Sequence, residues 1–106
     1  MAVDEAMSTN IFDTLDRWLE VRRHHLGAKG ITVSATRGPI DRPLSAVWVD
    51  FESATRAARL IVWADGQADL AVLDREKGEE LLNEHREITS TVGLDDVESS
   101  VLARLG

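Results

Sequence analysis

The chain has 106 residues, of which 43% are hydrophobic and 29% charged, so its composition is that of a folded globular protein with room for one core. A formal net charge of −7, from 19 acidic and 12 basic side chains, disfavours binding to nucleic acid and to anionic membranes and would instead attract a basic protein. The absence of cysteine excludes disulfides, thiolate catalysis and cysteine-ligated zinc.

Residues 1–10 include Asp4 and Glu5 and lack a basic region followed by an apolar stretch. They therefore predict a flexible lead-in rather than a secretory signal. No apolar run approaches the roughly 18 residues that a membrane span needs. We expect a cytoplasmic protein in which residues 11–106 form a single domain.

The first predicted element is an amphipathic helix from Ile11 to Leu26. Its apolar stripe, at helical spacing, consists of Ile11, Phe12, Leu15, Trp18, Leu19 and Leu26. Asn10 or Ser8 can cap the start, and Gly27 and Gly30 offer stops.

After Gly30 the apolar residues recur with period two, which predicts strands. The expected strands cover residues 31–36, 44–52, 59–64 and 68–74, with the segment Gly38–Pro43 and its two prolines as a break. Between two apolar runs, Asp65-Gly66 predicts a two-residue type I′ hairpin. The pairs that this turn would place opposite each other are Trp63 with Ala68, Ile61 with Leu70, and Arg59 with Val72.

The segment from Glu79 to Ile88 is ambiguous. The preceding turn signal, Arg75–Gly78, favours a strand, whereas the run from Glu79 to Glu84 has good helix propensity. We predict a strand and keep the helix as the alternative.

The chain closes with a predicted helix whose apolar face consists of Leu94, Val97, Val101, Leu102 and Leu105. Asp95 and Asp96 lie near its start, where negative charge is favourable. The predicted fold is therefore an α+β two-layer sandwich. An antiparallel β-meander of about five strands would carry an N-terminal and a C-terminal helix on one face.

Residues with catalytic or metal-binding chemistry are sparse. His24 and His25 are adjacent, so on a helix they point about 100° apart, and His85 is the third histidine. The sequence has neither a GxSxG nucleophile motif nor a glycine-rich phosphate loop. We predict no metal site, no cofactor and no enzyme activity, with acid–base work by paired carboxylates as the option that spacing leaves open.

The remaining candidate site is a protein-binding surface. The predicted hairpin would place Trp63, Ile61, Leu70 and Phe51 in the core under the helices. The opposite face would then carry Trp48, Asp50, Glu52 and Asp69 together with Leu60, Val62, Ala71 and Leu73. Because two helices cover one side only, we expect this acidic-rimmed apolar face, with partner-binding residues Trp48, Asp50, Glu52 and Asp69, to meet a partner. The alternatives are that inside and outside are reversed, or that Trp48 lies beneath the Pro39–Pro43 loop.

Four stretches carry a family resemblance: Phe12 to Arg22 with its Trp18-Leu19-Glu20, Ala46 to Ser53, Arg59 to Leu70, and Val92 to Asp96. Together they resemble the TriTu-type immunity proteins of bacterial polymorphic toxin systems, over nearly the whole chain from Ile11 to Leu105. The resemblance implies an antitoxin that occupies a cognate toxin domain, with a ribonuclease as one candidate toxin. It implies no roles for particular residues.

The expected function is neutralisation of a basic toxin by steric and electrostatic blocking, in which acidic side chains pair with the arginines and lysines that would grip nucleic acid. One alternative is a non-catalytic scaffold or homodimeric assembly subunit that uses the bare sheet face. Another is a small regulatory ligand-binding domain.

Overall fold

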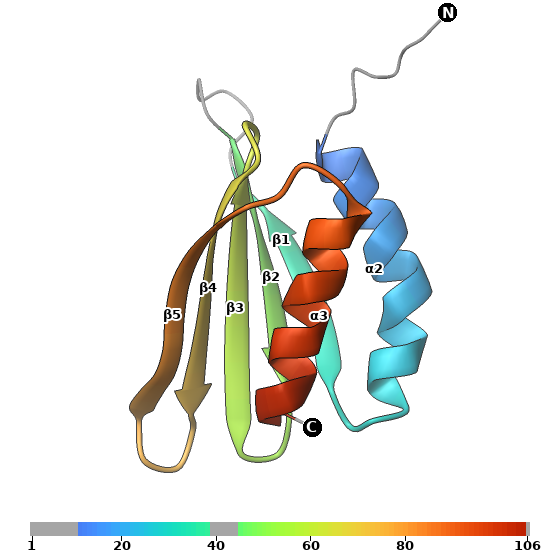
Figure 1. The fold of residues 1–106 in the computed structure, drawn as a ribbon. Helices are drawn as coiled ribbons and strands as arrows, with labels where there is room; N and C mark the ends of the chain where they lie inside the picture. The colour runs from blue at the N-terminus through green and yellow to red at the C-terminus, as the bar shows by residue number, and fades with distance from the viewer. Residues whose placement is uncertain (1–10, 39–44, 106) are drawn as a thin grey trace, which may run out of the picture.

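The computed structural model describes residues 11–38 and 45–105, which form two helices and a five-stranded antiparallel sheet (Figure 1). In chain order the elements are α2 (Ile11–Gly27), β1 (Thr32–Arg37), β2 (Ala46–Glu52), β3 (Arg56–Trp63), β4 (Gln67–Asp74), β5 (Glu79–Glu87) and α3 (Thr91–Leu105). The strands follow one another across the sheet in sequence order, so the predicted α+β fold with a five-stranded meander is confirmed. The predicted lead-in and the proline-containing break lie outside the described residues.

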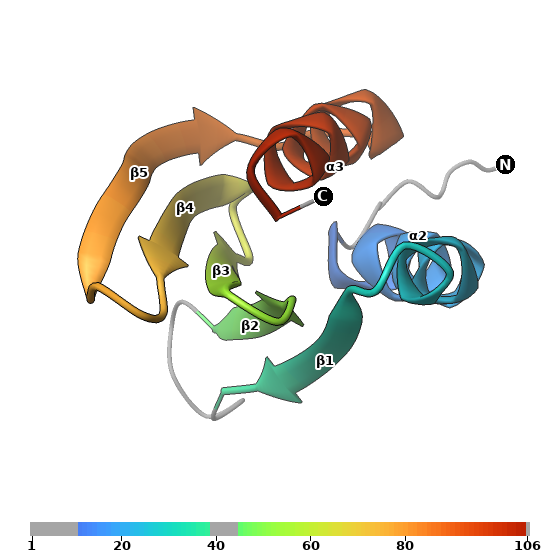
Figure 2. The same cartoon turned by 90° about the horizontal axis from the view of Figure 1, so that it is seen from below.

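Both helices lie on the same side of a strongly curved sheet, which curls around them (Figure 2). We call this side the inner face and the opposite, convex side the outer face. Strands β2, β3 and β4 fill the core with alternate side chains, namely Val47, Val49, Phe51, Ala58, Leu60, Val62, Ala68, Leu70 and Val72. Helices α2 and α3 add the apolar stripes that their periodicity predicts, apart from the partly buried Phe12 and Leu102 at the edge of the core.

The ambiguous segment forms strand β5, as predicted. The preceding turn is held by the Asp74 carboxylate, which accepts the backbone N–H groups of Glu76 and Lys77 at 3.0 Å each. The hydrogen bond from Lys77 is the main reason why the pKa of Asp74 lies below its usual value. Once β4 offers an open edge, hydrogen-bond pairing along the ladder outweighs the helix propensity of the glutamate-rich run.

The hairpin between β3 and β4 differs from the prediction, because its loop has three residues, 64–66, instead of two. The N–H of Gly66 donates to the carbonyl oxygen of Trp63 at 2.9 Å, and Gly66 has φ 91°. Asp65 has no positive φ, so a type I′ turn is excluded. A type I turn followed by a left-handed glycine needs a positive φ at Gly66 only. A type I′ turn would need a positive φ at Asp65 as well, which is unfavourable for a residue other than glycine.

The longer loop shifts the pairing by one residue. Leu60 faces Leu70 and Val62 faces Ala68, and both β3 side chains are fully buried. A one-residue shift moves the side chains of a strand to opposite faces of the sheet. The predicted core positions of Ile61 and Trp63 are therefore wrong: both lie half-buried on the outer face.

The same shift corrects the other predicted residues of β3. Leu60 and Val62, which were expected on the bare face, belong to the core. Arg59 faces Ala71 instead of Val72. By contrast, Leu70 and Phe51 are buried under the helices as predicted.

Substitutions at the neighbouring residues Leu60 and Ile61 test this face assignment. We expect Leu60→Ala to lower the free energy of unfolding by about 2–5 kcal/mol, because it leaves a cavity in the core. Ile61→Ala on the outer face should cost only about 1 kcal/mol. Urea unfolding followed by circular dichroism measures both, and equal losses would contradict the assignment.

The loop geometry predicts a second matched pair at the glycines of the two hairpins. Gly66 and Gly78 both have positive φ, but a Cβ at Gly66 would lie 2.7 Å from the Ile88 carbonyl oxygen, whereas a Cβ at Gly78 meets nothing within 4 Å. Gly78→Ala should therefore cost about 1 kcal/mol of stability from backbone strain alone. Gly66→Ala should cost roughly 3 kcal/mol, because the Ile88 backbone must also move. Thermal or urea unfolding measures both losses of stability. Equal losses for the two variants would contradict the close approach of Gly66 to the Ile88 carbonyl.

Candidate functional site

The outer face of the sheet brings together side chains from all five strands. Cross-strand pairing aligns them in rows that run from β1 to β5. The first row is Thr36, Trp48, Ile61, Asp69 and His85; the second is Ser34, Asp50, Arg59, Ala71 and Asn83; the third is Thr32, Glu52, Ala57, Leu73 and Glu80. The four residues expected to bind a partner, Trp48, Asp50, Glu52 and Asp69, thus lie on one face, in three successive rows.

Two tryptophans and an isoleucine form the apolar centre of this face. Trp48 lies directly opposite Ile61, and Trp63 lies opposite Ala46 at the next position along the same strands. All three large side chains are half-buried, although no helix covers them. Ile61 and Trp63 were not predicted for this face, although Arg59 alternates with them along β3 and a charged side chain indicates that its set faces solvent.

The indole of Trp48 also contacts the end of β1. A Cβ placed on Gly38 would come within 3.0 Å of the Cη2 and Cζ3 atoms of Trp48. The ring therefore packs against the Gly38 backbone, just before the Pro39–Pro43 loop, which itself lies outside the described residues. This contact holds one edge of the ring and explains its partial burial.

The acidic side chains of the site differ in how far they are neutralised. Asp50 accepts two hydrogen bonds from Arg59, from Nε at 2.6 Å and from Nη2 at 3.1 Å. These hydrogen bonds and the attraction of the carboxylate raise the pKa of Arg59 above its ordinary value. Glu52 has only a loose ion pair, 3.9 Å from Arg75 Nη1, and its side chain is 56% exposed.

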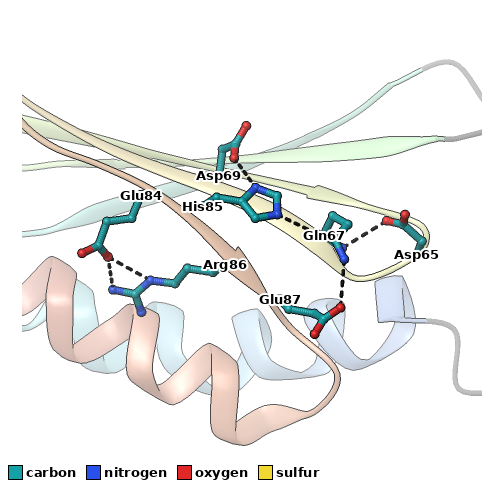
Figure 3. A network of polar contacts seen from close by, with 7 residues as sticks. All are labelled: Asp65, Gln67, Asp69, Glu84, His85, Arg86 and Glu87. Carbon is teal, nitrogen blue, oxygen red and sulfur yellow. Dashed lines mark hydrogen bonds and ion pairs between the residues drawn. The ribbon is translucent and has the colours of Figure 1, made fainter.

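Asp69 belongs to a chain of polar contacts across β4 and β5 (Figure 3). Its Oδ1 lies 2.8 Å from Nδ1 of His85, and the other ring nitrogen of His85 lies 2.5 Å from Oε1 of Gln67. Gln67 in turn donates from Nε2 to Glu87 at 2.9 Å. The contacts fix these side chains on the outer face, whereas the neighbouring Arg86 points to α3 and bonds Ser100.

The outer face is strongly acidic. Among the described strand residues, one arginine, Arg59, points to this face, and the carboxylates on it are Asp50, Glu52, Asp69, Glu80 and Glu87. The outer face thus combines an apolar cluster with five carboxylates.

The outer face also has a hollow of about 350 Å³, which the sequence does not predict. Its lining residues are Asp50, Glu52, Ala57, Ala58, Arg59, Ala71 and Leu73. Ala57 and Ala71 form its floor, because their methyl groups are short beside the longer side chains of Arg59 and Leu73.

A second hollow, of about 450 Å³, lies between the two helices and is lined in part by Trp18, Arg22 and Asp95. Trp18 Nε1 and Arg22 Nη2 both donate to Oδ1 of Asp95, at 2.9 and 3.1 Å. Arg22 also lies 3.6 Å from the buried carboxylate of Glu98. These polar groups bind one another and hold α2 against α3, so we assign this hollow a structural role.

Within residues 11–38 and 45–105, no three histidine or acidic side chains cluster in a way that could hold a metal ion. His24 and His25 are exposed at the end of α2, far in the chain from His85. No helix of the described chain is both long enough and apolar enough to cross a bilayer.

A comparison with protein families finds one matching model, described as Immunity protein TriTu, over residues 13–103. The match includes all five strands and most of both helices. The curated proteins give no match to the chain.

Proposed function

Because the chain belongs to the TriTu immunity protein family, we propose that it binds a cognate bacterial toxin domain through the outer face of its sheet and blocks that domain's working surface. The family supports the immunity role itself. The observation that supports the binding face is the pair of half-buried tryptophans on a side of the sheet that neither helix covers. We propose residues 11–106 as one immunity domain, acting in the cytoplasm.

The apolar centre supplies the anchor of the proposed interface. Trp48, Ile61 and Trp63 are adjacent on β2 and β3 and would lose their remaining water contact under a partner. Tryptophan is enriched among the residues that dominate binding energy, and such residues gather at the centre of an interface. A partner that covers this centre would dissociate slowly.

The carboxylates supply attraction for a basic toxin. A protein that grips nucleic acid carries clustered arginine and lysine, so a ribonuclease fits as the toxin. The acidic face and the net charge of −7 would speed its approach and pair with the same cations. Inhibition then needs binding only, and we propose that the protein acts without catalysis.

The charge of the outer face also weighs against a homodimer closed through it. In such a homodimer, the five carboxylates of one copy would face the five carboxylates of the other. Among the described strand residues, each copy would supply one arginine, Arg59, to balance them. Like charges in contact disfavour association. A basic partner of different sequence therefore fits this surface better than the chain itself.

Tryptophan variants test the anchor. We expect the cognate toxin domain to be encoded by a neighbouring gene. Against this domain, Trp48→Ala should speed dissociation, with a loss of about 2–4 kcal/mol of binding free energy. Val92→Ala is the matched control, because Val92 is an exposed apolar residue on α3, away from the outer face. Surface plasmon resonance gives the rates, and growth of cells that express both proteins reports protection.

Acid variants test the electrostatic contribution. The double variant Asp50→Asn/Glu52→Gln should slow association, and the effect should shrink near 1 M salt, where screening reaches about 3 Å. Glu20→Gln is the control for the loss of negative charge elsewhere on the protein, because Glu20 is an exposed residue of α2. If the Trp48 and acid variants stay folded and bind and protect like the parent, the proposed interface is wrong. Full protection by a variant that cannot bind would refute blocking itself.

A further inference from the structure

The hollow on the outer face lies next to the row that contains Trp48. It is lined by both apolar and charged side chains. Its floor, Ala57 and Ala71, is half-buried, and Leu73 at its edge is 44% exposed. Ala57 pairs with Leu73 and Ala71 pairs with Arg59, so the two methyl groups lie on a diagonal between β3 and β4. The hollow therefore results from two short side chains on neighbouring strands, beside the longer side chains of Arg59 and Leu73.

The rim of the hollow carries one carboxylate that is still free to accept a cation. Asp50 is occupied by the two hydrogen bonds from Arg59. Glu52 is more than half exposed, and its ion pair with Arg75 has the long distance of 3.9 Å. An exposed pair of this kind contributes little, so Glu52 can exchange Arg75 for another cation at low cost.

The hollow has an apolar floor, and its rim carries Glu52 beside the mutually paired Asp50 and Arg59, which matches a side chain with a hydrocarbon stem and a positively charged head. Lysine and arginine bury their methylene groups along apolar surfaces while the head stays at the edge. The Asp50–Arg59 pair shows that this face already holds a guanidinium in two-point contact with a carboxylate.

We infer that the hollow between Ala57, Ala71 and Leu73 receives one lysine or arginine side chain of the toxin, whose charged head pairs with Glu52. This inference rests on the proposed function, since it takes the outer face as the toxin-binding surface. It adds a specificity element next to the tryptophan anchor: the depth of the hollow selects a long side chain, and Glu52 selects a cation.

A filling variant tests the hollow. Ala71→Leu places a larger side chain in the hollow and leaves the core intact, because Ala71 points to the outer face. Ala103→Leu is the matched control, since Ala103 is an exposed alanine on α3, away from the outer face, and does not line the hollow. With the toxin domain, we expect Ala71→Leu to raise Kd about tenfold or more and Ala103→Leu to change it less than about twofold. Urea unfolding checks that both variants are as stable as the parent.

A double-mutant cycle identifies the chemistry of the occupant. Glu52→Gln is combined with alanine substitutions of each surface lysine and arginine of the toxin domain. We expect Glu52→Gln to raise Kd about fivefold against the parent toxin and to have no effect against one toxin variant, whose missing cation is the occupant.

The outcomes separate this inference from the proposed function. If Ala71→Leu and Glu52→Gln bind like the parent while Trp48→Ala binds weakly, the hollow is empty in the complex and the inference fails alone. If Trp48→Ala also binds like the parent, the outer face is not the interface and both fail. If Ala71→Leu weakens binding but no toxin cation couples to Glu52, the occupant is not a basic side chain and the inference is overturned.

Discussion

The left-handed glycine at the β3–β4 turn determines which side chains of β3 meet the helices. Gly66 has φ 91°, and its carbonyl oxygen accepts the Ile88 N–H at 2.7 Å, which ties the turn to the residue that follows β5. This geometry fixes a three-residue loop and thereby the register of the central hairpin. The core receives Leu60 and Val62, and Arg59, Ile61 and Trp63 are thereby left on the outer face.

Hydrogen bonds between the two helices help to hold both of them on the inner face. Trp18 and Arg22 of α2 share one carboxylate oxygen of Asp95 in α3, so the two helices form one layer over the concave side of the sheet. The chain has no further helix among its described residues that could cover the convex side. Two half-buried tryptophans therefore remain at the surface, and this is the observation on which the proposed binding face rests.

In the proposed complex, the outer face would combine two kinds of interaction with different roles. The apolar centre around Trp48 and Trp63 would act over short distances and govern how long the complex lasts. The carboxylates would act over about 10 Å and govern how fast a basic partner arrives. The inferred cation site beside Glu52 would add recognition of one long, positively charged side chain.

The sequence by itself determined the two helices, strands β1 to β4 and the face shared by Trp48, Asp50 and Glu52. The alternation of side chains along one strand is a local property that no pairing can change. Only the tertiary structure decided which side chains of the neighbouring strands lie beside these residues. Asp65-Gly66 is compatible with a two-residue or a three-residue loop, and only the backbone conformation of Asp65 distinguishes the two. Likewise, β5 is a strand because the edge of β4 is there to pair with it. The positions of Ile61, Trp63 and the alanine-floored hollow depend on contacts between strands, and a one-residue difference in a loop was enough to exchange the core and the surface of β3.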